Sequence, residues 1–152
     1  MNHRRQYCTL RVGDLYLGID VERIQEVLRD TSITPVPLAH ATISGLINLR
    51  GQIVTAIDLR QRMGLGVADP SAGTSTMVLG TNEEPLALVV DSVGDVVDVT
   101  EDSFEPPPDT LKGEARRMIL GAHKLERELL LVLNLEVALN LKAFDHREGA
   151  PE

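Results

Sequence analysis

The stretch over residues 43–65, ISGLINLRGQIVTAIDLRQRMGL, constrains the fold more than any other part of the chain. Apolar residues lead into and out of a short polar segment, where Gly51 can take the positive φ that a tight turn needs. Asp58 then stands just before Leu59 and Met63, as a helix-capping residue stands before an apolar pair at helical spacing. The stretch therefore predicts a strand, a tight turn, a second strand and a short helix.

The end of this pattern recurs near the C-terminus, because residues 133–141 align with residues 57–65. The capping residue recurs as Asn134, and the apolar pair recurs as Leu135 and Leu139. Each copy lies at the end of one half of the chain, so the repeat predicts two similar modules.

Composition excludes several classes of protein. Hydrophobic residues make up 43% of the 152 residues but aromatic residues only 3%, which favours an aliphatic core and leaves no stacking platforms for single-stranded nucleic acid. A formal net charge of −8 repels nucleic acid and anionic membranes. The single cysteine, Cys8, cannot form an internal disulfide, and we expect it in the core rather than in a catalytic role. Since no apolar run approaches the ~20 residues of a membrane span, we expect a soluble cytoplasmic protein with no nucleic-acid partner and no direct membrane insertion.

Most of the chain has the alternating pattern of short strands. Hairpins are predicted within residues 6–19, 43–57, 76–90 and 118–133. Apolar residues at helical spacing after Asp20 predict a helix over residues 21–28. Residues 31–40 contain two prolines and should form an edge or extended segment, while Gly94 predicts a bulge.

These elements predict an all-β protein with short helices, built as two five-stranded β-barrels. We expect the first barrel, with the C-terminal helix, in residues 6–65 plus 134–145, the second barrel in residues 66–133, and flexible termini at residues 1–5 and 146–152. Residues 66–75, rich in Gly, Pro and Ser, are the expected linker, and residues 101–117 an ordered loop.

The sequence lacks the motifs of an enzyme or a metal site. No CxxC, HExxH, GxSxG or Walker sequence is present, and the four histidines are scattered singly. The acidic residues Asp91, Asp95 and Asp98 are explained as exposed turn residues. We expect no catalytic residues, no cofactor and no metal.

Two charged residues admit two interpretations each. Arg50 is either a solvated turn residue or a recognition cation held on a rigid hairpin. Glu26 lies either on a solvent-facing surface or beside an apolar patch of Ile24 and Val27 as a recognition anion. Local pattern does not choose between them.

Several segments resemble the CheW-like chemotaxis coupling proteins. In the first half they are residues 17–20, 24–27, 43–51 and 57–60, and in the second half residues 88–93 and 119–121. The Asn48-Leu49-Arg50-Gly51 turn followed by Asp58-Leu59-Arg60 is the most specific part, and the similarity extends from about Tyr7 to Leu141. Where the family usually has proline, this chain has Thr55, which affects local stiffness.

The resemblance implies two SH3-like barrels with a groove between them and a non-catalytic, stand-alone adaptor. Such an adaptor connects the cytoplasmic tip of a chemoreceptor to the regulatory domain of a chemotaxis-type histidine kinase, in the cytoplasm but recruited to membrane receptor arrays. The implied receptor-binding residues are Ile24, Glu26, Val27, Gly45, Asn48, Arg50 and Gly51, with Glu26 and Arg50 paired across the groove. The implied kinase-binding residues are Val36, Leu38, Phe104, Pro107 and Leu111.

Three other functions remain as alternatives, and the sequence does not identify which signalling pathway the adaptor serves. A scaffold of a non-flagellar chemosensory pathway, such as twitching motility, would have the same residues. An SH3-like RNA- or ribosome-binding module conflicts with the net charge and the few aromatic residues. A small hydrolase using Cys8 or a His/Asp pair lacks a recognisable motif.

Overall fold

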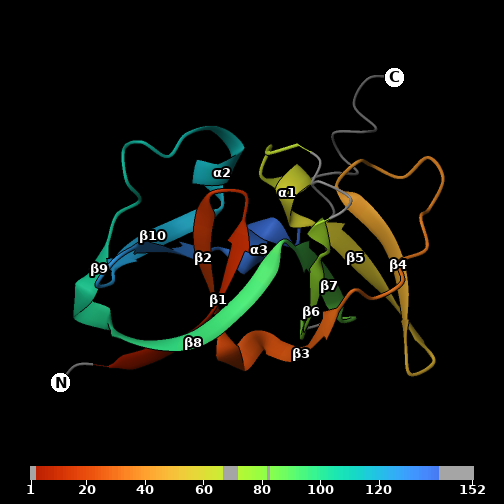
Figure 1. Cartoon of the computed structure of the whole chain (residues 1–152), viewed down its shortest axis with the longest axis horizontal. Coiled ribbons are helices and arrows are strands. Elements are labelled where there is room, and N and C mark those ends of the chain that lie inside the picture. The colour runs from red at the N-terminus through yellow and green to blue at the C-terminus, as the bar shows by residue number, and fades with distance from the viewer. Residues whose placement is uncertain (1–2, 67–71, 82, 141–152) are drawn as a thin grey trace.

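The computed structural model describes residues 3–66, 72–81 and 83–140, which form two β-sheets with short helices near their junction (Figure 1). Sheet A has the strand order β8 (Ser92–Thr100), β1 (Arg4–Val12), β2 (Leu15–Asp20), β11 (Leu129–Leu133), β10 (Ile119–Lys124) and β9 (Phe104–Glu105). Sheet B has the order β3 (Ile24–Arg29), β6 (Ser75–Leu79), β7 (Leu86–Val90), β5 (Gln52–Asp58) and β4 (Ile43–Leu49). The helices are α1 (Leu59–Arg62), α2 (Gly113–Arg117) and α3 (Leu135–Ala138), with 3₁₀ turns η1 (Val21–Arg23) and η3 (Glu101–Ser103). The predicted class, mostly β with short helices, is confirmed.

The chain passes twice through the same succession of elements. A first hairpin (β1–β2 or β6–β7) is followed by an edge strand (β3 or β8), a second hairpin (β4–β5 or β10–β11) and a short helix (α1 or α3). Both second hairpins shift register at a glycine, Gly45 in one copy and Gly121 in the other. Both helices begin with a side-chain cap: Asp58 has φ −82° and ψ 106°, and Asn134 has φ −85° and ψ 97°. The predicted repeat is therefore a true structural repeat.

The two copies exchange their first hairpins. In sheet A, β1–β2 lies between β8 and β11 of the second copy, and in sheet B, β6–β7 lies between β3 and β5 of the first copy. Each exchange is completed by a parallel pairing, β2 with β11 and β7 with β5. The strands thus divide between the sheets differently from the ranges 6–65 and 66–133 predicted for the barrels. Local hairpin signals fix the pairing inside a hairpin but do not specify which distant strand lies against its outer edge.

The buried apolar side chains form three clusters, of which the largest joins the two sheets. The central core lies between the two sheets and contains twenty buried residues from both copies, including Leu10, Leu17, Ile57, Met77 and Leu88. Six buried residues pack on the other face of sheet B and four on the other face of sheet A. Since fully burying an aliphatic side chain contributes about 1.5–3 kcal/mol, the central core dominates the apolar stabilisation. Side chains therefore fill the junction, and a groove between the modules can exist only along its rim.

One predicted helix is wrong. Asp20 does cap a helical turn, because its side chain accepts a hydrogen bond from the backbone N–H of Glu22, but the turn ends after Arg23. Residues 24–29 continue as β3 and pair with β6. The pairing of β3 with β6 overrides the helical spacing of the apolar residues, because β6 provides hydrogen-bond partners for the backbone N–H and C=O groups of residues 24–29.

Other local expectations have mixed outcomes. The bulge at Gly94 is confirmed by a register shift in the β1–β8 pairing. The expected loop at residues 101–117 contains η3, β9 and α2, and the expected flexible N-terminus contributes Arg4 and Arg5 to β1. Within the proline-containing segment, Thr34 forms a single bridge to Leu46. Residues 67–71 of the linker, residues 141–145 of the first predicted barrel and residues 146–152 of the predicted flexible terminus lie outside the described residues.

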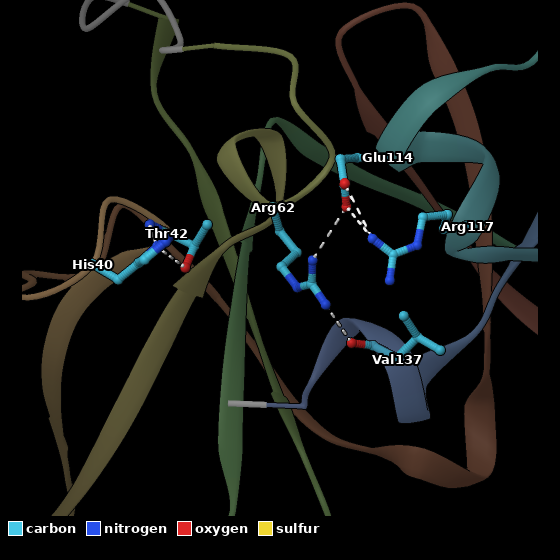
Figure 2. A network of polar contacts seen from close by, with 6 residues as sticks. All are labelled: His40, Thr42, Arg62, Glu114, Arg117 and Val137. Atoms are coloured by element: carbon cyan, nitrogen blue, oxygen red, sulfur yellow. Dashed lines mark hydrogen bonds and ion pairs between the residues drawn. The ribbon is translucent and has the colours of Figure 1, made fainter. Parts of the chain in front are cut away.

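A buried arginine connects the helices of the two copies (Figure 2). The side chain of Arg62, on α1, is only 4% exposed. Its Nη2 donates a hydrogen bond of 2.8 Å to the carbonyl oxygen of Val137 on α3, and its Nη1 lies 3.8 Å from a carboxylate oxygen of Glu114 on α2. Arg117 also pairs with Glu114, at 3.1 Å, but it is well exposed. Arg62 thus adds a side-chain donor to a carbonyl at the end of α3 that also accepts a hydrogen bond of 3.3 Å from the backbone N–H of Asn140.

Replacing Arg62 by Met should lower the free energy of unfolding by about 1–3 kcal/mol, because a side chain only 4% exposed would lose both its hydrogen bond to the Val137 carbonyl and its ion pair with Glu114. Urea denaturation measures this change. Arg117→Met is the matched control, since an exposed pair to the same Glu114 should contribute less than about 1 kcal/mol. Equal losses for both variants would contradict the assignment of Arg62 as the buried link between the copies.

Candidate functional site

The turn between β4 and β5 holds Arg50 in an unusual backbone conformation. Arg50 and Gly51 are the two central residues, with φ values of +54° and +87°, as in a type I′ turn. The Asn48 side-chain oxygen accepts a hydrogen bond of 2.9 Å from the backbone N–H of Gly51. The left-handed conformation costs a non-glycine residue about 1–2 kcal/mol. Such strain at a named residue supports a functional role for its side chain.

Arg50 forms an ion pair with Glu26, and this pair connects opposite edges of sheet B. The Nη2 atom of Arg50 lies 2.8 Å from a carboxylate oxygen of Glu26. Because β3 and β4 are the two outermost strands of the sheet, the contact requires sheet B to curl round into a barrel. The Arg50 side chain is 72% exposed and that of Glu26 is 25% exposed, so the pair contributes only about 0–1 kcal/mol to stability. The structure thus brings together the two charges that the resemblance had paired.

The residues of β3 do not share one face. Because of a register shift after Ile24, Ile24 lies opposite Leu79 and Val27 lies opposite Met77. The side chains of Leu79 and Met77 lie in the central core. Glu26 faces the other side. Ile24 packs against the central core, whereas Val27 is 41% exposed. Of the predicted trio, Glu26 and Val27 therefore reach solvent from opposite faces of the same strand.

Sequence reasoning missed an exposed valine on β8. Val96 pairs with Cys8 of the central core and yet is 52% exposed. Val27 and Val96 thus occupy the same kind of place, on the core-facing side of the edge strand of each sheet, and both strands run along the lower side of the molecule in Figure 1. If successive side chains of β8 had alternated strictly between its two faces, the sequence would have shown the face on which Val96 lies. The bulge at Gly94 interrupts that alternation.

Gly45, one of the receptor-binding residues that the resemblance implies, lies within β4 and not in the turn. It is buried within β4, with φ +148°, and a Cβ there would collide with the backbone carbonyl of Thr34. Gly121 has the same role in the other copy, where a Cβ would collide with Phe104. Gly45 therefore permits the close approach of the residue 31–40 segment to β4.

The residues predicted to bind the kinase lie at the two ends of the molecule. The Thr34–Leu46 bridge and the pairing of Glu105 with Ala122 occupy corresponding places of the repeat, and Figure 1 shows β4 and β9 at opposite ends. Among the predicted kinase-binding residues, Val36, Leu38 and Phe104 are exposed. Pro107 is half-buried, and Leu111 packs against the central core. Leu38 is fully exposed and has φ +65°. The structure therefore separates this group into two surfaces.

Phe104 lies at an aromatic hollow of about 330 Å³ on sheet A. Its ring centroid is 5.3 Å from that of His123, which is itself 5.9 Å from the ring of Tyr7. His123 is buried, and its Nδ1 lies 2.7 Å from the hydroxyl oxygen of Ser103. Burial, with a smaller contribution from Arg5, lowers the pKa of His123. Its burial and its contacts with Tyr7, Phe104 and Ser103 make His123 a structural side chain.

Cys8 and Asp91, which the sequence analysis also considered, have structural roles in the fold. Cys8 is buried, and burial raises the pKa of its thiol. One carboxylate oxygen of Asp91 accepts hydrogen bonds of 2.8 Å from both Arg60 and the backbone of Gly13. Across the described ranges, no three His, Cys, Asp or Glu side chains are grouped so as to hold a metal ion. None of the helices described in this chain is long and apolar enough to cross a membrane.

A family model of the CheW-like domain matches residues 6–143. The chain belongs to the CheW-like domain family. Among curated CheW relatives, the probable chemotaxis protein CheW of Rhizobium etli is 29% identical over 132 residues, which cover 87% of this chain and 85% of the relative. Protein FrzA of Myxococcus xanthus is 32% identical over 111 residues, covering 73% of this chain and 68% of FrzA.

A solved CheW structure has the same fold. The scaffolding protein TtCheW of Thermoanaerobacter tengcongensis superposes with a TM-score of 0.77 at 28% identity, covering 86% of this chain and 89% of that protein. The likeness confirms the predicted architecture of two SH3-like subdomains and places this chain among CheW-type chemosensory signalling proteins.

Gly45→Ala should lower the free energy of unfolding by about 3 kcal/mol, because the methyl group meets the Thr34 carbonyl and the backbone cannot relax without breaking the Thr34–Leu46 bridge. Gly113→Ala is the control: Gly113 has φ +71° but open space around it, so strain alone should cost about 1 kcal/mol. Thermal and urea unfolding compare the two variants. A smaller loss for Gly45→Ala than for Gly113→Ala would contradict the packing role.

The thiol of Cys8 should react with a disulfide reagent at neutral pH at least ~10-fold more slowly in the native protein than in urea, because burial excludes the reagent and the raised pKa leaves less thiolate. The chain has one cysteine, so the reaction reports this site alone. Equal rates in the two conditions would show that Cys8 is accessible.

Proposed function

We propose that this CheW-like protein is a non-catalytic adaptor that couples chemoreceptors to a chemotaxis-type histidine kinase through protein–protein contacts. The observation that carries the proposal is the Arg50–Glu26 ion pair at the edge of a closed barrel. The pair adds little to stability, and the turn that presents Arg50 is strained. An exposed charged pair on a strained turn is suited to recognition, because rim charges set partner register and association rate.

The proposed receptor surface is centred on this pair. Arg50 and Glu26 supply the charges, and Asn48 and Gly51 hold the turn that carries Arg50. Val27 supplies exposed apolar area on the opposite face of β3 from Glu26. Ile24 supports β3 from the central core, and Gly45 supports β4 through its contact with Thr34. The cytoplasmic tip of a chemoreceptor is the proposed partner of this surface.

The proposed kinase contacts are the two ends of the molecule. One end presents Val36 and Leu38, and the other presents Phe104 and Pro107, with Leu111 fixing the second segment to the core. Two separate apolar ends allow one chain to contact a neighbour on each side. The regulatory domain of the histidine kinase is the proposed neighbour, which would hold this cytoplasmic protein in membrane receptor arrays. Chemotaxis proteins predominate among the named relatives, which favours a chemotaxis pathway over the non-flagellar alternative.

Arg50→Asp should abolish binding of a receptor-tip fragment, since it reverses the charge on the proposed surface, while the melting temperature stays within a few degrees because the ion pair is exposed. A pull-down with the fragment and a thermal melt measure the two effects.

The double variant Glu26→Arg/Arg50→Glu is the control. It keeps an ion pair of reversed polarity, so it should retain the fold but still fail to bind the receptor fragment. Full binding by Arg50→Asp would remove Arg50 from the receptor surface, and full binding by the double variant would show that the pair has only a structural role.

A further inference from the structure

The internal repeat shows that a histidine has replaced an aliphatic residue in the interior of one module. The offset that aligns residues 57–65 with residues 133–141 also aligns Ile47 of β4 with His123 of β10. Each lies two residues after the glycine at which its hairpin shifts register, and each is 1% exposed. The position therefore requires a buried side chain, and an apolar one meets that requirement in the other copy.

Phe104 is the counterpart of Ile33 in the same comparison. A Cβ on Gly45 would lie 2.8 Å from a methyl carbon of Ile33, and a Cβ on Gly121 would collide with the ring of Phe104. One copy thus has two isoleucines where the other has a phenylalanine and a histidine, whose ring centroids are 5.3 Å apart. Only the second pair contains a group that titrates near neutral pH.

The contacts of the His123 ring fix where a further proton must go. The hydroxyl of Ser103 donates a hydrogen bond of 2.9 Å to the carbonyl oxygen of Thr100, so its oxygen is left to accept one of 2.7 Å from the Nδ1–H of the neutral ring. The neighbouring side chains on β1 and β11 are the ring of Tyr7, at 5.9 Å, and the buried Leu130. A further proton would go to Nε2, which has no hydrogen-bond partner within the described residues.

The charged groups near His123 do not offset its burial. Burial is the largest cause of its lowered pKa, Arg5 on β1 lowers the pKa further, and Glu105 on β9 acts in the opposite direction. Arg5 is itself paired with carboxylates on η3 and β2, Glu101 at 3.0 Å and Asp20 at 3.5 Å. A charged His123 is therefore disfavoured as long as the ring stays enclosed.

The strand that encloses His123 is held by few contacts. β9 is the outermost strand of sheet A and pairs with β10 at two positions, Phe104 with His123 and Glu105 with Ala122. The ion pair between Glu105 and Lys124, at 3.8 Å, is exposed and adds little. The Phe104 side chain is already 46% exposed. Such a segment can leave the sheet while the central core stays folded.

We propose that His123 is a proton-sensitive latch for residues 103–105. With the ring neutral, its bond to Ser103 and its contact with Phe104 hold this segment on sheet A. When Nε2 takes up a proton, the segment leaves β10 and the charged ring reaches water. Phe104 thereby loses its fixed place at one of the proposed kinase contacts, but the latch itself does not depend on that proposed function.

The direction of the pH dependence follows from the burial. In the open form the pKa of His123 returns to the ordinary value of about 6.5, whereas in the closed form it is lowered. Closure is therefore fully stabilised above pH ~6.5 and weakens as the pH falls below it, because the open form binds a proton that the closed form does not.

The test uses the full chain without a partner. In an NMR titration, the ring of His123 should titrate below pH ~6.5, and the ring resonances of Phe104 should shift with the same midpoint. Amide exchange, corrected for its intrinsic pH dependence, should show opening of residues 103–105 that increases by up to ~10-fold from pH ~7.5 to ~5.5. The amides of Thr34 and Leu46, which bond to each other's carbonyls at 2.8 Å in the other copy, should show no such change.

His123→Ile, which introduces the residue found in the other copy, should keep the fold and remove the pH dependence of opening. His40→Gln, which removes a histidine of the other module, should leave that dependence intact. Titration of His123 at or above pH ~6.5, no matching shift of Phe104, or an unchanged pH dependence in His123→Ile would each overturn the proposal. If circular dichroism shows that His123→Ile does not fold, the titration of the unaltered chain decides.

Discussion

The central core between the two sheets is the constraint on which the rest of the molecule depends. Leu10 and Leu17 of one hairpin meet Ile57, Met77 and Leu88 of the other sheet in a cluster far larger than either outer core. Neither sheet can remove these side chains from water alone. The exchange of hairpins follows the same logic, because each sheet contains strands of both copies. The two modules therefore form one packed block, which suits a protein whose partners contact several of its faces.

Because the junction is filled, the surfaces available to partners lie on its rim and at its ends. Val27 and Val96 are exposed on edge strands whose inner faces continue into the central core. Arg50 is held on a two-residue turn whose backbone is set by the β4–β5 pairing and by the Asn48–Gly51 hydrogen bond. In this arrangement the rigid interior positions the exposed groups, and those groups contribute little to stability themselves.

The repeat preserves backbone geometry while the side chains have diverged. Asp58 and Asn134 cap equivalent helices with nearly identical torsion angles. Arg62 reaches across the junction from α1, whereas the corresponding residue on α3 is Ala138, which has no group to donate. One side of the junction is consequently fastened by buried and half-buried arginines, Arg62 and Arg60, whose counterparts on α3 are Ala138 and Glu136. Divergence of a few side chains on a conserved backbone has made two similar modules unequal.

The sequence by itself determined the local elements and the family. The β4–β5 turn, the caps at Asp58 and Asn134, the bulge at Gly94 and the buried Cys8 all follow from short-range chemistry, and the Asn48–Gly51 turn carried the resemblance. Only the tertiary structure decided the partition of strands between the sheets, the strand rather than helix at Ile24–Arg29, and the buried place of Gly45. It also placed Arg50 against Glu26, from opposite edges of one sheet. Each of these depends on a contact between segments far apart in the chain, and local periodicity carries no information about which distant edge a strand will meet.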